Sequence, residues 1–277
     1  MRGPCETIVV DNGSADGSAA MVAAEFPDVV LIANSGNESF ARGSNQGAAR
    51  ARGDFLLLLN PDVWVEAGTL DGLVAALEGH PERGAAAPRL RFADGRTQRS
   101  VRGFPDPLSL LFDLSGLARV LPGGRFGAYR QPAFDYDRAQ PAEQPMASCF
   151  LIAREAWERI GPMDERFPLF FNDADWCLRA RKAGYIIWYT PESVGQHAGG
   201  GTTKRVRRAA IWESHRALLR FYAKHYRATT ARPLYALLTG LITLGAWART
   251  NRWGEPLGRD GGETTAESLH RELERAG

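Results

Sequence analysis

The chain has 277 residues, enough for one large domain with appendages, and its 44% hydrophobic and 24% charged residues are ordinary for a globular protein with a core. A formal net charge of +2 excludes the global field typical of nucleic-acid binding, so no nucleic-acid partner is expected. Three widely spaced cysteines form neither a disulfide framework nor a zinc pattern. With no signal-peptide h-region and no apolar run of roughly 18 residues, these features predict a cytoplasmic protein.

Short apolar runs alternate with helical patterns in the first half of the chain. Predicted strands cover residues 7–11, 29–34 and 55–60, which are continuously apolar and rich in Val, Ile and Leu. Helical patterns follow them at 18–26, 45–53 and 67–81. This order predicts parallel βαβ units, hence an α/β fold with a mostly parallel sheet flanked by helices.

The second half begins with a region rich in Pro, Gly and Arg at 92–145, which is predicted as a long functional excursion with one helical stretch near 108–120. Regular patterns then return, with a strand and a helix at 147–161, a helix opening near 172, a strand at 185–191 and an amphipathic helix at 209–226.

An apolar block at 233–248 is flanked by Arg232 and Arg249. It is too short to span a membrane comfortably. As a helix it either lies in a membrane interface or packs on the core of the protein. We therefore expect a main domain over 1–226, followed by a helical extension and polar tail over 227–277.

The first predicted strand ends on Asp11 and enters a turn of Asn12, Gly13 and Ser14. In open parallel sheets, ligands bind beyond the carboxyl ends of the strands. A short Asp there accepts a hydrogen bond from a nucleobase N–H or a ribose hydroxyl. A plain turn that caps the following helix explains the same residues.

The strand at 55–60 runs out into Asn60-Pro61-Asp62. Pro61 biases Asn60 away from the helical region, so Asp62 is expected to emerge at the sheet edge. A carboxylate in that position suits a hard divalent cation that keeps several waters and binds phosphate oxygens. A strand-to-helix turn capped by Asp62 is the structural alternative.

His197 follows another strand and precedes three glycines. Neutral imidazole is a metal ligand, and glycines let the backbone approach a ligand closely, although a lone His also serves structural roles. The basic run at 204–208 is either a solvated face or a site for a pyrophosphate or anionic lipid.

Asn172, Asp173 and Asp175 fall in the first turn of the helix that opens near residue 172. There the helix dipole favours an ionised carboxylate, which is what a general base requires. Helix capping by Asp173 and an ion pair between Asp175 and Arg179 are the structural alternatives.

Four segments in this order resemble the family 2 inverting glycosyltransferases of the GT-A fold, particularly the rhamnosyltransferase-like branch. They are "VVDNGSADGS", "NESFARGSNQGAARARGDFLLLLNPDV", "MASCFLIAREAWERIGPMDERFPLFFNDADWCLRARKAGY" and "QHAGGGTT". The resemblance implies a GT-A fold and an inverting transfer of one sugar from a nucleoside diphosphate.

On the donor side, the resemblance implies that Asp11 reads the base or ribose of the nucleotide sugar, with Asn12 and Ser14 nearby. Arg42 and Asn45 would line the donor pocket.

Asn60 and Asp62 stand in the place of the family's metal-binding DxD motif. The resemblance implies that Asp62 holds Mg²⁺ or Mn²⁺ on the diphosphate, with His197 as a second protein ligand.

On the acceptor side, Asp173 matches the catalytic base, and Asp175 and Trp176 would shape the acceptor site. The expected acceptor is a growing surface glycan, typically lipid-linked, and the resemblance points to rhamnose on deoxythymidine diphosphate as the donor. We expect peripheral contact with the cytoplasmic face of the plasma membrane.

The sequence departs from the family pattern at several points. The family begins with a strand and helix that precede the "VVDNGS" strand, so we expect either a start upstream of Met1 or a protein without an interior strand. Asn60 and Asn172 replace acids, and Ser39 stands where Gly is usual. The alternatives are a catalytically inactive glycan-binding or scaffolding paralogue and a nucleotidyltransferase, which would need a Gly-rich phosphate loop with Lys that this chain lacks near its first strand.

Overall fold

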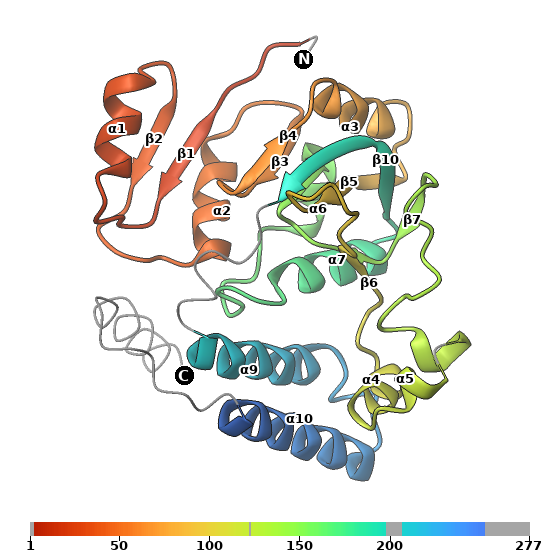
Figure 1. Cartoon of the computed structure of the whole chain (residues 1–277). Helices are drawn as coiled ribbons and strands as arrows, with labels where there is room; N and C mark the ends of the chain where they lie inside the picture. Colours follow the sequence, from red (N-terminus) through yellow and green to blue (C-terminus); the bar gives the residue numbers. More distant parts are fainter. Residues whose placement is uncertain (1–2, 122, 198–206, 253–277) are drawn as a thin grey trace. The chain divides into compact units, whose positions relative to one another are not determined.

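The computed structural model describes residues 3–121, 123–197 and 207–252, and it divides the chain into two compact units (Figure 1). Unit 1 comprises residues 1–102 and 135–197, and unit 2 comprises residues 103–134 and 198–277. Each unit is described by itself below.

Unit 1 is built on a six-stranded sheet in which β3, β5 and β10 run in one direction and the other strands run against them. The strand order is β3 (Phe55–Leu59), β9 (Cys149–Ala153), β5 (Arg83–Arg91), β10 (Ile186–His197) and β4 (Val63–Val65), with β7 (Gln140–Ala142) also paired to β10. The predicted α/β architecture is confirmed, but the six-stranded sheet is mixed rather than mostly parallel, because β9 inserts antiparallel between β3 and β5 and because β4 and β7 pair antiparallel with β10.

Helices cover both faces of this sheet, as the alternation of side chains in β9 shows. Leu151 joins a core cluster with Leu73 and Leu77 of helix α3 (Thr69–Leu77). Its neighbour Phe150 points to the other face, where its ring makes an edge contact with Trp176 of helix α7 (Asn172–Lys182) at 5.8 Å between centroids. Helix α6 (Arg154–Ile160) follows β9 directly.

The central strand β5 was not predicted, because its sequence RGAAAPRLR lacks the branched residues typical of buried strands. Ala85, Ala86 and Ala87 are almost fully buried, so small side chains here let the helices on either face approach closely. Gly84 serves the same purpose, because a Cβ atom at this position would lie 2.9 Å from the Cβ atom of Tyr185.

A second, two-stranded sheet holds β1 (Ile8–Asp11) parallel to β2 (Val30–Ala33), connected by α1 (Ser18–Glu25) and followed by α2 (Phe40–Arg50). Among the strands that the structure describes, β1 pairs only with β2, and β3 pairs only with β9. No strand of the described residues joins the two sheets. No residue of β1, α1 or β2 is fully buried.

Unit 2 is helical. Its elements are α4 (Pro107–Leu114), α5 (Leu117–Val120), the 3₁₀ helix η1 (Gly124–Gly127), α9 (Arg207–His225) and α10 (Arg232–Arg252). α10 packs against α9 and α4, with Phe221, Tyr222 and Leu238 fully buried.

The division into units differs from the predicted boundary at residue 226, because α9 groups with α10 and with part of the middle excursion rather than with the sheet. The excursion leaves and re-enters unit 1 beside the short pair of β6 (Val101–Arg102) and β8 (Gln144–Pro145). Within the described residues, every helix is too short or too polar to cross a membrane.

Candidate active site

Asp62 and His197 lie together at the edge of the six-stranded sheet. Antiparallel pairing places His197, the last residue of β10, opposite Val63 in β4. Asp62 directly precedes Val63, and its Oδ2 atom lies 3.5 Å from Nε2 of His197. The structure therefore brings together the two residues predicted as metal ligands.

The imidazole of His197 is oriented by Gln98, whose Oε1 atom lies 3.0 Å from Nδ1. Because an amide oxygen only accepts hydrogen bonds, Nδ1 carries the proton and Nε2 of the neutral ring keeps its lone pair. That lone pair faces the carboxylate of Asp62, so two acceptors lie opposite each other. A cation between them, or a proton on Nε2, relieves this repulsion.

One carboxylate and one imidazole suit a divalent cation whose remaining ligands are water and phosphate oxygens. In the part of the chain that the structure describes, no group of three or more His, Cys, Asp or Glu side chains is placed to hold a metal ion. The arrangement therefore fits a cation that is shared with a bound diphosphate better than a closed structural metal site.

Asn60 stands at the end of β3, where its backbone N–H donates to the carbonyl of Ser148 at 2.8 Å. Its side-chain nitrogen lies 3.5 Å from Oγ of Ser148. Its Oδ1 atom is buried and has no hydrogen-bond partner among the described residues. An unsatisfied buried oxygen is costly, so this atom is available to a ligand donor or a hydrated cation.

Asp173 lies in the first turn of α7 and is half-buried. Its Oδ1 atom accepts a hydrogen bond from the N–H of Ala174 at 2.8 Å, and the N–H of Ala147 also bonds this carboxylate. Burial nevertheless raises the pKa of Asp173, and these backbone hydrogen bonds only partly offset it. Desolvation therefore outweighs the local dipoles in setting the direction of this pKa shift, and ionisation of Asp173 at the helix start stays a prediction.

The residue before α7 has an unusual conformation. Phe171 has φ 66°, in the left-handed region that residues with side chains rarely adopt, and its carbonyl accepts the N–H of Asp175 at 2.9 Å. Strained backbone of this kind concentrates at functional sites. It aims the first turn of α7, and with it the Asp173 carboxylate.

One short segment connects the two halves of the site. The N–H of Ala147 donates to Asp173, and the carbonyl of Ser148 accepts from Asn60. Both residues are buried and directly precede β9. Residues 147 and 148 therefore position the candidate base, Asp173, and Asn60 of the candidate cation site near the point where β3 ends and β9 begins.

The structure corrects the prediction for Asp175 and Trp176, because neither side chain is accessible to an acceptor. Both are fully buried. Asp175 pairs with Nε of Arg179 at 2.9 Å, the structural alternative considered above. The indole of Trp176 donates to the carbonyl of Gly161 at 3.1 Å and stacks on Trp157.

Asp11 ends β1, and its Oδ2 atom accepts the N–H groups of Gly13 at 3.1 Å and of Ser14 at 3.0 Å. Gly13 has φ 75° and lies so close to Gly36 that a Cβ atom would approach its Cα to 2.8 Å. Asp11 therefore stabilises the turn, as the structural alternative predicted. The other carboxylate oxygen of Asp11 makes none of these turn hydrogen bonds.

The side chain of Asn12 ties this turn to the start of α2. Its nitrogen donates to the carbonyl of Ser39 at 3.0 Å, and its oxygen accepts from Asn34 at 2.9 Å. Asn12 therefore holds the turn in place, while the side chain of Ser14 remains exposed.

Arg42 and Asn45 both lie on α2. Arg42 is exposed and pairs with Glu38 at 2.8 Å. Asn45 exchanges two hydrogen bonds of 2.9 Å with the backbone of Met163 and donates to Glu165 at 3.0 Å. Asn45 thus fastens α2 to the loop that leads into α7, so its contact with a donor stays a prediction.

Sequence reasoning missed the residues that orient the site. Gln98, Ala147 and Ser148 contact His197, Asp173 and Asn60, respectively, through hydrogen bonds between residues far apart in the sequence. No local pattern marks such partners. The predicted glycine loop after His197 and the basic run at 204–208 lie outside the residues whose side chains the structure describes.

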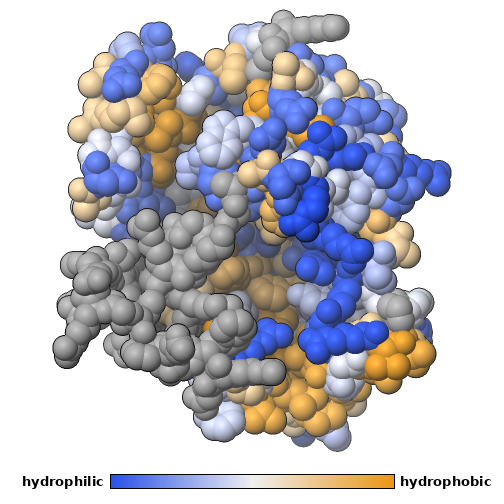
Figure 2. All heavy atoms as spheres, in the orientation of Figure 1, coloured by the Kyte–Doolittle hydropathy of each residue, from blue (hydrophilic) through white to orange (hydrophobic). Residues whose placement is uncertain are grey.

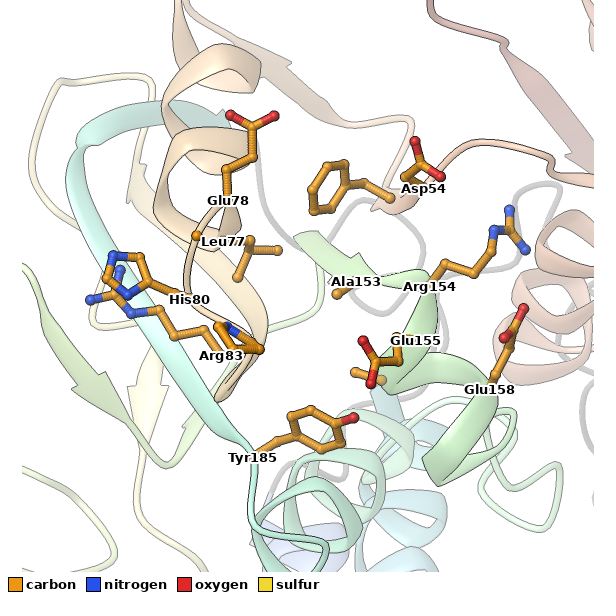
Figure 3. Close-up of a pocket in the computed structure, with 14 residues that line it drawn as sticks. Asp54, Leu77, Glu78, His80, Arg83, Ala153, Arg154, Glu155, Glu158 and Tyr185 are labelled. Atoms are coloured by element: carbon orange, nitrogen blue, oxygen red, sulfur yellow. The ribbon is translucent and has the colours of Figure 1, made fainter.

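A cavity of about 500 Å³ opens at the opposite ends of the strands, where β3 and β5 begin (Figure 3). Asp54, Glu78, Arg154, Glu155 and Tyr185 are among its lining residues. None of the predicted site residues lines it. The candidate active site is therefore assigned by the side chains that gather around Asp62, His197 and Asp173, and this cavity is not part of it.

Comparisons with known proteins agree with this geometry. The sequence model of the protein family described as "Glycosyl transferase family 2" matches residues 2–154. The chain is 28% identical over 259 residues to an N-acetylglucosaminyl-diphospho-decaprenol L-rhamnosyltransferase of Mycobacterium tuberculosis, covering 87% of this chain and 82% of the relative. It is 26% identical over 191 residues to the low-salt glycan biosynthesis hexosyltransferase Agl10 of Haloferax volcanii, covering 68% of this chain and 57% of the relative.

Solved structures show the same fold at low identity. The mannosyltransferase PcManGT from Pyrobaculum calidifontis, in complex with GDP-Man and Mn²⁺, is similar with a TM-score of 0.54 and 18% identity, covering 98% of this chain and 70% of that one. TarS of S. aureus gives a TM-score of 0.51 with 11% identity, covering 98% of this chain and 71% of that one.

Proposed function

The chain belongs to glycosyl transferase family 2, and from that premise we propose that it transfers rhamnose, with inversion, from a nucleoside diphosphate to a lipid-linked glycan. The observation that carries the proposal is the support shared by Asp173 and Asn60 beside the Asp62–His197 pair. The relative from Mycobacterium tuberculosis, whose name specifies rhamnose and a decaprenol-linked acceptor, supports the choice of substrates.

In the proposed reaction, Asp173 takes the proton of the acceptor hydroxyl. The hydroxyl oxygen forms a bond to the anomeric carbon as the bond from that carbon to the diphosphate oxygen breaks on the opposite face. Inversion by a single displacement requires one base and no covalent intermediate. Burial raises the pKa of Asp173, which makes its carboxylate a better proton acceptor than an exposed one.

Asp62 and His197 are the proposed ligands of a divalent cation, Mg²⁺ or Mn²⁺. When bound, such an ion stabilises the negative charge that develops on the departing diphosphate. The contact of Gln98 with Nδ1 orients the ring of His197, so that Nε2 of the neutral imidazole can bind the ion. The free Oδ1 atom of Asn60 is available to a coordinated water.

Asp11 is the proposed nucleotide reader. One of its oxygens is fixed by the N–H groups of Gly13 and Ser14, so the carboxylate is pre-oriented. Its other oxygen accepts from the base or ribose of the donor. Arg42, Asn45 and the amide network of Asn12 form the adjoining wall.

The test is a comparison of the full chain with Asp173→Asn and with Asp54→Asn, an exposed carboxylate where β3 begins. Each protein receives Mg²⁺ or Mn²⁺, a lipid-linked N-acetylglucosamine acceptor and a panel of sugar nucleotides. We expect diphosphate release and a glycosylated product with deoxythymidine-diphosphate rhamnose. Asp173→Asn should lower the rate by roughly 10²–10⁴-fold, the usual contribution of a general base. Asp54→Asn should match the wild type.

Equal rates for the two variants would remove Asp173 from the mechanism. Preference for another sugar nucleotide would change the donor and leave the chemistry standing. The separation of β1–β2 from the larger sheet favours one rival, a glycan-binding paralogue without activity. That rival predicts acceptor binding by the full chain without turnover of any donor.

A further inference from the structure

Unit 2 carries an exposed apolar face. On α10, the side chains of Leu237, Leu244 and Trp247 are 51%, 58% and 58% exposed, while Leu238 and Ile242 on the opposite side are buried. Figure 2 shows hydrophobic atoms gathered over α10 and again over the end formed by α4 and α5. Such a concentration of large exposed apolar side chains marks an interaction surface.

The α4–α5 end contributes Leu117, Val120 and Leu121, of which Val120 is 76% exposed. α10 packs on α4, and α4 packs on α5, so these elements belong to one helical layer. We call the six residues Leu117, Val120, Leu121, Leu237, Leu244 and Trp247 the apolar face of unit 2.

The stretch of unit 2 that contains most of α9 and all of α10 is one-sided in charge. Residues 214–254 contain seven Lys and Arg and no Asp or Glu. Exposed arginines lie on the elements of the apolar face and on the turns beside them, namely Arg119, Arg125, Arg227, Arg232 and Arg249. None of these five forms an ion pair with another described residue.

The few described carboxylates of unit 2 are already engaged. Asp106 caps α4 by accepting the N–H groups of Leu108 and Ser109. Asp113 pairs with Arg130, and the buried Glu213 pairs with Arg220 at 2.8 Å. Among the described residues, no carboxylate therefore compensates the positive charge of the arginines around the apolar face.

We propose that the apolar face of unit 2 docks on an anionic lipid bilayer, with Leu244 and Trp247 entering the interface and the arginines contacting phosphate headgroups. Apolar side chains beside cations, with a Trp on the exposed side of the helix, are typical of helices that lie in a membrane interface. A second protein copy would bring the same positive charge to the contact, which disfavours a dimer. The proposal rests on the proposed lipid-linked acceptor, which resides in such a bilayer.

Vesicle co-sedimentation of the full chain tests the proposal without any sugar nucleotide. The probes are phosphatidylcholine vesicles with 30% phosphatidylglycerol and vesicles of phosphatidylcholine alone. We expect binding to the anionic vesicles at least tenfold tighter than to the neutral ones, and weaker binding at high salt. Trp247→Glu and Arg232→Glu should each weaken anionic binding several-fold.

Matched controls come from unit 1, where Phe26 is 51% exposed and Arg50 is exposed. Phe26→Glu and Arg50→Glu should bind vesicles like the wild type. Equal losses in the control variants, or no sedimentation of the wild type, would overturn the proposal. So would a dimer in sedimentation velocity that Trp247→Glu dissociates while vesicle binding is unchanged.

Asp173→Asn separates this proposal from the proposed function. The variant should bind vesicles like the wild type although its rate of sugar transfer is strongly reduced. Vesicle binding without turnover of any donor would leave the docking face standing and refute the enzyme. Turnover of a donor without vesicle binding would support the enzyme and refute the docking face.

Discussion

Asp173, the proposed base, illustrates how the burial of a carboxyl group costs stability. Because burial raises the pKa of its carboxyl in the folded chain, the neutral form is favoured there. Its contribution to the free energy of unfolding is therefore fully present below the unfolded pKa of about 3.9 and is lost as pH rises through the higher folded pKa. At neutral pH the folded protein carries a carboxylate that it would hold more stably as a neutral group.

Asp173→Asn should consequently raise the melting temperature at pH 8 and change it little at pH 3. Asp16→Asn is a control of opposite sign, since hydrogen bonds from Ser18 lower the pKa of Asp16. That substitution should lower the melting temperature at pH 8 more than at pH 3. Calorimetry at both pH values measures the two differences, and a pH-independent effect of Asp173→Asn would contradict the assignment.

Ser39 occupies a backbone conformation that suits glycine. Its φ of 75° and ψ of 162° fall in a region that is essentially confined to Gly and costs other residues about 1–3 kcal/mol. Its hydroxyl accepts the N–H of Arg42 at 3.4 Å as a helix cap, and replacing such a cap by Gly costs only a few tenths of a kcal/mol.

Ser39→Gly should therefore increase the free energy of unfolding by about 1 kcal/mol, as measured by urea denaturation. The matched control is Ser44→Gly, in the interior of the same helix. It should destabilise the protein by roughly 0.5 kcal/mol. Destabilisation of similar size by both substitutions would show that residue 39 carries no strain.

At the scale of elements, the β1–β2 sheet should be the least protected strand pair of unit 1. All four residues of β1 are half-buried, and the sheet has only two strands. β5 is buried along most of its length and is paired on both sides. Local opening free energies follow such differences in burial.

Native-state hydrogen exchange by mass spectrometry should show the amides of Val9 and Leu31 exchanging well before those of Ala86 and Leu151. The latter pair oppose each other between β5 and β9. Equal protection would mean that the two sheets unfold as one cooperative unit. Addition of the donor should slow exchange at Val9 if Asp11 binds its nucleotide.

The strands that a sequence reveals are those with apolar residues of good strand propensity. β1, β2, β3 and β9 fell into predicted strands for this reason. β5 escaped because a strand between two helical layers is served best by alanines, which carry no strand signature. β10 extends to His197, well beyond the predicted end at residue 191, because the polar residues in its second half pair with β4 and β5.

The part of the candidate site that the sequence predicted is the pair of proposed metal ligands, because a carboxylate and an imidazole at motif positions indicate their chemistry directly. Asp62 and His197 lie within 3.5 Å of each other although 135 positions separate them in the sequence. Asp175 and Trp176 were assigned to the acceptor side by the family resemblance of the segment that contains Asp173. A helix turns by about 100° per residue, so neighbours along the chain face different surroundings, and these two face the core.

At the scale of the whole molecule, the chain passes through each unit twice. Local patterns cannot show that residues 103–134 group with a helix 100 residues later, because this grouping depends on α10 packing on α4. The boundary expected at residue 226 marked the change in composition rather than the change in packing partner.

The three thiols report on the integrity of the whole fold. Cys5 is exposed, whereas Cys149 and Cys177 are buried. Burial raises the pKa of Cys149 to about 12 and that of Cys177 well above its ordinary value. Since only a thiolate reacts with Ellman's reagent, the native protein should release one equivalent of chromophore promptly and three in guanidinium. Rapid reaction of all three without denaturant would indicate an open core.

The segment of residues 147 and 148 has a mechanical consequence. It holds the carboxylate of Asp173 through one backbone group and the end of β3 through the next. In a displacement from behind, the base and the leaving group stand on opposite sides of one carbon atom. Because the same two residues hold the carboxylate of Asp173 and the end of β3, both groups shift together when this segment moves. Their alignment therefore persists through thermal motions that would disturb groups held by separate loops.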